Sequence, residues 1–520
     1  MQPRLASGLV LIAAIAWAEP APCAGAAADG STARPAADVD ALTPVDGLVM
    51  LDYQSIPVRG YPSIDLLGAH VLTPFGPGLY LGVGAHAPVL KGNYGGFMAF
   101  DLTLHAQHDV VGRLYADAGL SLGGGAGGGS AQQARIIAGS GAFLKGYAGL
   151  GVRFDDFSAG VNVSRARFTQ SVISGTQLDF FVQMPFTATL GSYASAGRRY
   201  PLDLAAAPSV PDANVMRFGV DNFFQIKPTG SFKGTVSLAD LQFEHFLTRD
   251  LYLLVEGSVG VRGLPTYNQL LGGAGIRRAV DRRLALSAQV AVGTGGYAPD
   301  RFDTGSGLLV YPKLAADYRL TDSLGLSLTG GALFAPRGTS RNLTLGAALD
   351  YHLSPDRWHL LDGGSRDTLH QGYRYHVFQQ SELKPRIGDR TQGAIRLLSS
   401  QVDAVLDANV YLPMQASIAT NRFLGYPGYG EALAGLGAQT TASSTHPFQA
   451  YAQLLAGINV HGLIAKPALG LDVGLGDRLA LFAQVGKTFS VNVAHLYPER
   501  YRFNTTNVGL GLTWRFSLPM

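Results

Sequence analysis

Two patterns that could serve catalysis overlap in the stretch "GLSLGGGAGGGSAQQARII", which spans Gly119–Ile137. The first is the G-x-S-x-G of serine hydrolases, formed by Gly119, Ser121 and Gly123. It requires a strand that turns sharply at the serine and leads into a helix. The second is the G-x-G-x-x-G of nucleotide-binding folds, formed by Gly123, Gly125 and Gly128. It must open a helix and be followed by an acidic residue about twenty positions later.

Neither pattern has the context that its chemistry needs. In "RLYADAGLSLG", apolar residues alternate from Leu114 to Leu122, so the strand continues through Ser121 without a turn. After the glycines, the next acidic residues are Asp155 and Asp156, beyond the further glycine-containing stretch "GSG". We therefore interpret the glycine-rich stretch as a flexible loop or bend that joins two strands.

The histidines offer no metal-binding pattern in the sequence. His105 and His108 form H-x-x-H, but residues three apart on a strand face opposite sides, so the pair cannot easily share an ion. His359, His370 and His376 lie in or next to a predicted linker, where no helix or recognised motif fixes their geometry. The sequence predicts solvated histidines, and it predicts no metal site, no cofactor and no catalytic residue.

The composition narrows the class of protein. Charged residues make up 15% of the 520 residues, below the quarter or so that is typical of soluble proteins, and 67 residues are glycine. The net charge of +3 and the lack of basic runs argue against nucleic acid as a partner. Beyond the N-terminal segment no run of eighteen apolar residues occurs, which argues against a protein that spans a membrane with helices.

The N-terminus has the features of a secretory signal peptide. In "MQPRLASGLVLIAAIAWAEP", Arg4 precedes a short apolar run that ends in the small-x-small sequence Ala16-Trp17-Ala18. We predict a signal peptide over 1–18 and a disordered, Ala/Pro-rich lead segment over 19–45. Cys23 is the only cysteine, so the exported fold must be stable without an internal disulfide.

The rest of the chain shows strand periodicity. In "GLIAKPALGLDVGL", Leu463, Leu469 and Leu471 share one face, while Lys466 and Asp472 lie on the other. This strand is long enough to cross a bilayer, for which about nine to eleven tilted residues are needed.

The sequence also contains a tandem duplication. Gly307–Gly331 matches Gly462–Gly486 without a gap, and Arg217–Pro228 matches Arg374–Pro385. Each copy has about eight strands, and most turns on one side are tight while those on the other side are longer, as in transmembrane barrels. We expect repeat units at 215–353 and 372–516, a diverged β unit at 46–190, linkers at 191–214 and 354–371, and a tail at 517–520.

The last strand carries the most specific signal. In "NVGLGLTWRF", the apolar residues alternate strictly from Val508 to Phe516. This pattern resembles the C-terminal insertion signal of bacterial outer-membrane β-barrel proteins, although in that class the phenylalanine is usually terminal and here Ser517–Met520 follows. The resemblance implies location in the bacterial cell outer membrane, with lipid and the barrel-insertion machinery as partners.

The predicted fold class is all-β: a transmembrane antiparallel β-barrel built from tandem eight-stranded units. Two assemblies fit, namely one large barrel of roughly twenty-four strands and two to three small barrels. The long linkers favour separate closure, whereas the many inward Gly and Ala residues favour a wide interior. Of the two, we prefer the single large barrel.

The repeats place a matched set of polar residues on the inward face. The candidate lumen lining consists of Gln242, Glu244, Glu256 and Asp317 in the first repeat and Gln401, Asp403, Gln415 and Asp472 in the second. Such a set can select solutes in a pore, or it can form a structural network that fills the barrel.

Three functions follow from this architecture. The first is a passive or export pore for solutes or polymer, without covalent chemistry. The second is a structural or adhesive surface barrel that has no open channel and meets an unidentified partner through its loops. The third is an outer-membrane lipid hydrolase, although no set of serine, histidine and carboxylate residues indicates one. We expect no enzymatic activity.

Overall fold

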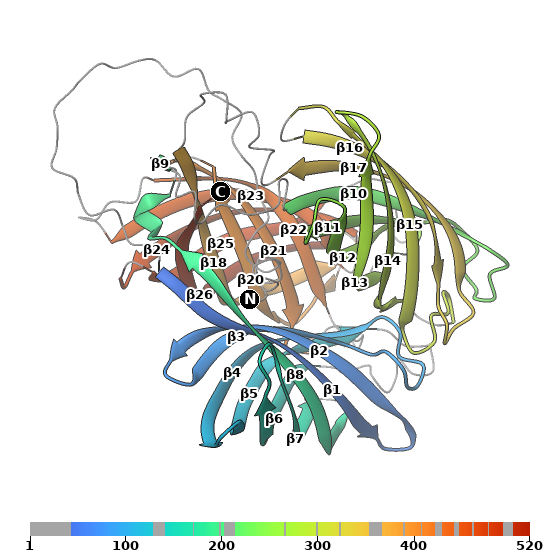
Figure 1. The fold of residues 1–520 in the computed structure, drawn as a ribbon, viewed down its shortest axis with the longest axis horizontal. Coiled ribbons are helices and arrows are strands. Elements are labelled where there is room, and N and C mark those ends of the chain that lie inside the picture. Colours follow the sequence, from blue (N-terminus) through green and yellow to red (C-terminus); the bar gives the residue numbers. More distant parts are fainter. Residues whose placement is uncertain are drawn as a thin grey trace.

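The computed structural model describes residues 43–127, 141–169, 171–196, 199–201, 214–264, 267–297, 300–321, 324–352, 367–387, 390–406, 408–421, 429–440, 447–459, 462–476, 478–491 and 503–519. Almost all of these residues lie in antiparallel strands, and the longest of them form three closed barrels (Figure 1). The predicted signal peptide and most of the lead segment lie outside the described residues.

The first barrel consists of β1 (Thr43–Val58), β2 (Tyr61–Gly76), β3 (Leu79–Ala87), β4 (Phe97–Val111), β5 (Leu114–Gly127), β6 (Ala142–Arg153), β7 (Ser158–Phe168) and β8 (Ser174–Leu190). It closes because β1 pairs with β8. The segment expected to be a diverged β unit is therefore a complete eight-stranded barrel. A short 3-10 helix, η2 (Tyr193–Ser195), and the strand β9 (Arg199–Pro201) follow it.

The two repeat units form the second and third barrels. The second consists of β10 (Asn214–Gln225), β11 (Val236–Phe246), β12 (Leu251–Arg262), β13 (Asn268–Ala279), β14 (Leu284–Gly296), β15 (Leu308–Arg319), β16 (Leu324–Phe334) and β17 (Arg341–His352). The third consists of β18 (Asp367–Ile387), β20 (Ile395–Val405), β21 (Val410–Ala419), β22 (Gly430–Gln439), β23 (Phe448–Asn459), β24 (Gly462–Gly474), β25 (Leu479–Ser490) and β26 (Phe503–Pro519). The short β19 (Arg390–Thr391) and β9 pair with β18.

The preference for one large barrel is wrong, and the alternative of three small barrels is correct. The closing pairs β1–β8, β10–β17 and β18–β26 use both edges of each unit, so no edge remains to continue the sheet into the next unit. The inward glycines that suggested a wide lumen instead make room for aromatic rings. A Cβ atom at Gly275 would lie 2.3 Å from Cζ of Tyr252, and one at Gly437 would lie 2.1 Å from Cζ of Tyr411.

The glycine-rich stretch of the sequence belongs largely to a strand. The strand continues through Ser121 as predicted, but it extends to Gly127, so the glycines at 123–127 belong to β5 and not to a loop; residues 128–140 lie outside the described residues. Ser121 points inward, is buried and hydrogen-bonds the Thr103 hydroxyl at 2.7 Å, which is no geometry for a nucleophile elbow. Gly119 and Gly125 are required by the Tyr147 and Phe168 rings, which lie 2.3 Å and 2.2 Å from where a Cβ would stand.

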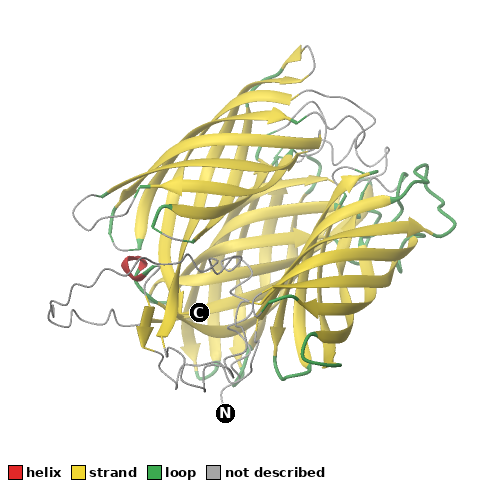
Figure 2. Ribbon diagram, turned by 90° about the horizontal axis from the view of Figure 1, so that it is seen from above, coloured by secondary structure: helices red, strands yellow, loops and turns green. Residues whose placement is uncertain are grey.

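The three barrels point in the same direction. On the side of the longer loops, the Gly95 amide of the first barrel donates to the Gly305 carbonyl of the second at 3.0 Å. On the opposite side, Gly191 follows β8 and forms a β-bridge with Ser517 of β26. A cluster of apolar residues from all three barrels joins them there: Leu190, Met216, Phe243, Tyr373, Ala404, Phe516 and Leu518. Figure 2 shows the three barrels side by side.

Candidate functional site: the polar barrel interiors

The structure places all eight predicted lumen residues inside the barrels. Gln242, Glu244, Glu256 and Asp317 are buried in the second barrel, and Gln401, Asp403, Gln415 and Asp472 are buried in the third. The period-two alternation positions them, because their neighbours on the same strands point to the outer face of the barrel. On β24, for example, Asp472 is buried while Leu469 is 62% exposed.

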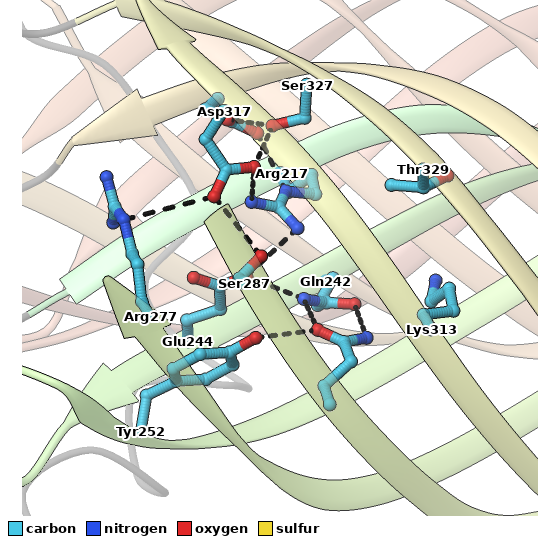
Figure 3. A network of polar contacts seen from close by, with 12 residues as sticks. Arg217, Gln242, Glu244, Tyr252, Arg277, Ser287, Lys313, Asp317, Ser327 and Thr329 are labelled. Atoms are coloured by element: carbon cyan, nitrogen blue, oxygen red, sulfur yellow. Dashed lines mark hydrogen bonds and ion pairs between the residues drawn. The ribbon is translucent and has the colours of Figure 1, made fainter. Parts of the chain in front are cut away.

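Arg217 lies inside the second barrel, near its tight-turn end, and is the shared partner of several buried carboxylates (Figure 3). Its guanidinium lies 2.8 Å from Asp350, 2.9 Å from Asp317 and 3.3 Å from Glu244, and all four side chains are buried. The hydroxyls of Ser287 and Ser327 donate to Asp317 at 3.2 Å and 2.7 Å. The predicted lining residues Glu244 and Asp317 therefore belong to one ion-pair network across the barrel.

Paired glutamines form a layer beside this network. The amide nitrogen of Gln242 donates to Gln289 at 3.1 Å, and that of Gln289 donates back at 2.9 Å. The Tyr252 hydroxyl donates to the same Gln289 oxygen at 3.0 Å. The third barrel repeats this arrangement with Gln401, Gln453 and Tyr411.

A lysine forms a second charged layer in each of the two repeats. In the second barrel, Nζ of Lys313 lies 2.7 Å from Glu256 and 3.2 Å from Asp221. In the third barrel, Nζ of Lys466 lies 2.6 Å from Glu431 and 3.6 Å from Glu382. These two lysines are not among the predicted lining residues, although each shares the inward face of its strand with one of them, Asp317 on β15 and Asp472 on β24.

Arg374 takes the place of Arg217 in the third barrel. It lies 2.7 Å from Asp403 and 3.8 Å from Asp472, and its guanidinium stacks 4.4 Å from the centre of the Tyr411 ring. His376 joins the same carboxylate, with Nε2 2.8 Å from Asp403 and Nδ1 2.7 Å from the Thr513 hydroxyl. The prediction of a solvated histidine is wrong for His376, because β18 turns this position inward.

The segment that leaves the first barrel covers one mouth of the third. Tyr193 of η2 is buried in a cluster with Phe378, Val405, Tyr411, Tyr451 and Phe482. Burial raises the pKa of the Tyr193 hydroxyl, while the nearby Arg374 guanidinium partly opposes this shift. Tyr193 therefore occupies the mouth as a neutral aromatic plug.

The first barrel has its own charged interior. Nζ of Lys145 lies 2.5 Å from Asp52 and 3.0 Å from Asp179, and His70 and His86 lie between Asp52 and Asp101. This group was not predicted from the sequence, because its members come from six strands with irregular spacing. Only the registers across the closed barrel bring them together.

The two histidines of the H-x-x-H pattern lie on opposite faces of β4. His105 points inward, where Nδ1 lies 2.8 Å from the Tyr147 hydroxyl, so the prediction of a solvated side chain is wrong for it. His108 is exposed, and the two residues of H-x-x-H do face opposite ways. His359 lies outside the described residues.

The outer faces complete the arrangement. Large apolar side chains project from all three barrels, for example Leu120 at 60%, Leu314 at 66% and Leu510 at 66% exposure. A polar, ion-paired interior inside an apolar exterior is the pattern of barrels that lie in lipid. Among the described residues, no helix is long and apolar enough to cross a membrane.

The sequence matches no protein family and no curated protein. Among solved structures, a mutant ferric enterobactin receptor, PfeA, from Pseudomonas aeruginosa is 11% identical with a TM-score of 0.24, over 91% of this chain and 80% of the receptor. OccK1 (OpdK) from the same species is 9% identical with a TM-score of 0.21, over 91% and 98%. A designed transmembrane β-barrel is 12% identical with a TM-score of 0.20, over 28% and 98%. None of these likenesses identifies a family.

Proposed function

We propose that this chain is an outer-membrane protein whose three filled barrels form a rigid, non-conducting anchor that presents its longer loops at one membrane face. The observation that carries this proposal is the filling of the interiors by buried, paired side chains. An eight-stranded barrel has an interior just wide enough for side chains. In this role the protein has no catalytic function.

The ion pairs support closed interiors. Arg217 contacts carboxylates from three different strands, β11, β15 and β17, so its network crosses the interior of the second barrel. Arg374 and the plug residue Tyr193 occupy the corresponding end of the third. A water path through either barrel would require these buried ion pairs to separate.

The membrane location is supported by the apolar exterior and by the predicted signal peptide. The last strand, β26, has Val508, Leu510 and Leu512 on its outward face, as the insertion-signal resemblance requires. We include recognition of β26 by the barrel-insertion machinery in the proposal.

Hydrogen bonds join the first and second barrels on the side of the longer loops. Besides the contact between Gly95 and Gly305, the Thr294 hydroxyl donates to the Pro88 carbonyl at 2.5 Å and the Ser306 hydroxyl donates to the Val89 carbonyl at 2.6 Å. The loop 88–96 of the first barrel is therefore fixed to the second barrel. A partner that binds this face would meet one surface built from two barrels.

Single-channel conductance of the refolded mature chain in a planar lipid bilayer tests the proposal. Insertion is verified first by protease resistance and by a heat-dependent shift in gel mobility. We expect an inserted protein without uniform current steps. Stable steps of one size, with an ion selectivity that shifts in Glu244→Gln and Asp403→Asn, would overturn the proposal in favour of a pore. Release of fatty acid from labelled phospholipid would favour a hydrolase instead.

A further inference from the structure

The first barrel contains a group of buried side chains with potential metal-ligand atoms, several of which make no hydrogen bond. One ligand atom from each of Asp52, His70 and His86 lies within 4.8 Å of the others. All three side chains are buried. Oδ1 of Asp52 and both ring nitrogens of His70 make no hydrogen bond. Buried polar atoms without a partner are rare in folded proteins, and each one calls for an explanation.

The strand registers build this group. Asp52 of β1 pairs with Gly68, and Gly68 pairs with His86 of β3. Two residues further along β2, His70 pairs with Gly84, and Gly84 pairs with Asp101 of β4. Each inward row therefore has two polar side chains that flank a glycine.

The two glycines leave room for the ligand atoms of the group. A Cβ atom at Gly68 would lie 2.1 Å from Oδ1 of Asp52 and 2.7 Å from Nδ1 of His86. A Cβ atom at Gly84 would lie 2.4 Å from Nε2 of His70 and 2.7 Å from Oδ1 of Asp101. The donor atoms thus occupy space that any other residue at these two positions would fill.

We propose that Asp52, His70 and His86 bind a divalent transition-metal ion of the Zn²⁺ type inside the first barrel. Oδ1 of Asp52 lies 3.4 Å from Nδ1 of His70. Two ligands on a tetrahedral ion with bonds of about 2.0–2.1 Å stand about 3.4 Å apart, so this pair already has the required spacing. Imidazole and carboxylate form a donor set that Zn²⁺ accepts.

Asp101 acts as the positioning residue. Its Oδ2 lies 2.6 Å from Nε2 of His86, and its Oδ1 accepts a hydrogen bond from Thr103 at 2.8 Å and lies 3.6 Å from Nε2 of His70. With the proton of His86 on Nε2, its Nδ1 carries a lone pair, which accepts from the Gln54 side-chain nitrogen at 3.4 Å and would turn to the ion on binding. Metal-binding histidines regularly donate their other N–H to a carboxylate, which fixes the tautomer and the ring orientation.

The formal charges of the group favour a dication. Asp52, Asp101 and Asp179 carry three negative charges against one positive charge on Lys145, which leaves two negative charges when both histidines are neutral. Lys145 is held by Oδ2 of Asp52, so Oδ1 stays available to the ion. Buried charges are normally paired or coordinated to a metal.

The test uses the full mature chain without a histidine tag, refolded with Zn²⁺ and dialysed. Elemental analysis should find one equivalent of zinc per chain, and refolding with Co²⁺ should give the visible absorption of a four-coordinate nitrogen–oxygen site. The double variant His70→Gln/His86→Gln should bind at least tenfold less metal, and Asp101→Asn should lower the affinity about 10–100-fold. His105→Gln, a buried histidine of the same barrel outside the group, should keep the full equivalent.

Wild-type protein that folds without bound zinc or cobalt would overturn the proposal, and so would equal binding by the double variant. In either case His70 and His86 are a charged bridge between two carboxylates. If the double variant fails to fold, the cobalt spectrum of the wild type and the affinity of Asp101→Asn still decide. Because all readouts measure metal, they are independent of the conductance experiment.

Discussion

The ring of Tyr252 lies directly over Gly275 on the neighbouring strand, where a Cβ atom would stand 2.3 Å from Cζ of the ring. The third barrel repeats this relationship with Tyr411 and Gly437. The glycine is therefore part of the core packing of the second barrel, since its missing side chain is replaced by the aromatic ring.

Gly275→Ala should destabilise the second barrel by about 1–3 kcal/mol, because the added methyl group forces the Tyr252 ring out of its position. The free energy of unfolding is measured by urea titration of the refolded protein, followed by circular dichroism. Gly257→Ala is the matched control, since a Cβ atom at Gly257 meets nothing within 4 Å. Equal effects of the two changes would show that the ring does not depend on the glycine.

Replacing Arg217 by methionine should cost about 3–5 kcal/mol, because Glu244, Asp317 and Asp350 would then be buried without their cation. The same urea titration measures the loss. Arg278→Ala removes an exposed ion pair with Asp250 and should change the stability by less than about 1 kcal/mol. A small effect of Arg217→Met would mean that the acidic groups are solvated or neutral, which contradicts a filled interior.

Cysteine labelling tests whether the three barrels share one direction. In a Cys23→Ser background, single cysteines at Lys91, Lys233 and Gly393 should react with a membrane-impermeant maleimide on intact cells, because all three positions are exposed on the side of the longer loops. Cysteines at Arg113, Arg249 and Ala408 lie in the tight turns of the opposite side and should react only after permeabilisation. A barrel with the reverse pattern would contradict the common orientation.

Tyr94 should titrate at high pH. Burial raises its pKa to about 12, and its hydroxyl donates to the Pro62 carbonyl at 2.5 Å. The folded pKa is above the ordinary value of 10.0, so the contribution of neutral Tyr94 to stability is complete below pH 10 and is lost as the pH rises through 12. An ultraviolet titration of the wild type minus Tyr94→Phe isolates this residue; a midpoint near 10 would show that the 88–96 loop leaves it solvated.

The sequence allowed the strands and their faces to be predicted, but not the number of barrels. Alternation on β24 correctly assigns Lys466 and Asp472 to the inside and Leu469 to the outside. Whether a unit closes depends on which strand edges pair. Tyr373 pairs with Phe516 across the closure of the third barrel, and nothing in the sequence around these two residues indicates that they are partners. Inward glycines fit both a wide lumen and a tyrosine-filled one, and only the ring positions distinguish the two.

The polar interiors of the two repeated barrels were predicted from the sequence, but the polar interior of the first barrel was not. The duplicated residues were found because each copy identified the other, as with Gln242 and Gln401. Asp52, His70 and His86 have no such copy, and their proximity depends on registers that follow from closure of the first barrel. A short-range motif search therefore finds H-x-x-H at His105 and His108 and misses the group that lies together.

Tyr193 also has a consequence for biogenesis. It belongs to the segment that directly follows the first barrel, yet it is buried against Phe378 and Phe482 of the third, and Ser517 on the last strand bridges back to Gly191. A chain cut short before Phe503 would lack β26 and so expose the edges of β18 and β25, with the segment around Tyr193 left without its place. Because β26 is synthesised last, the third barrel can close only after the whole chain has been made. Until then, the edges of β18 and β25 remain unpaired.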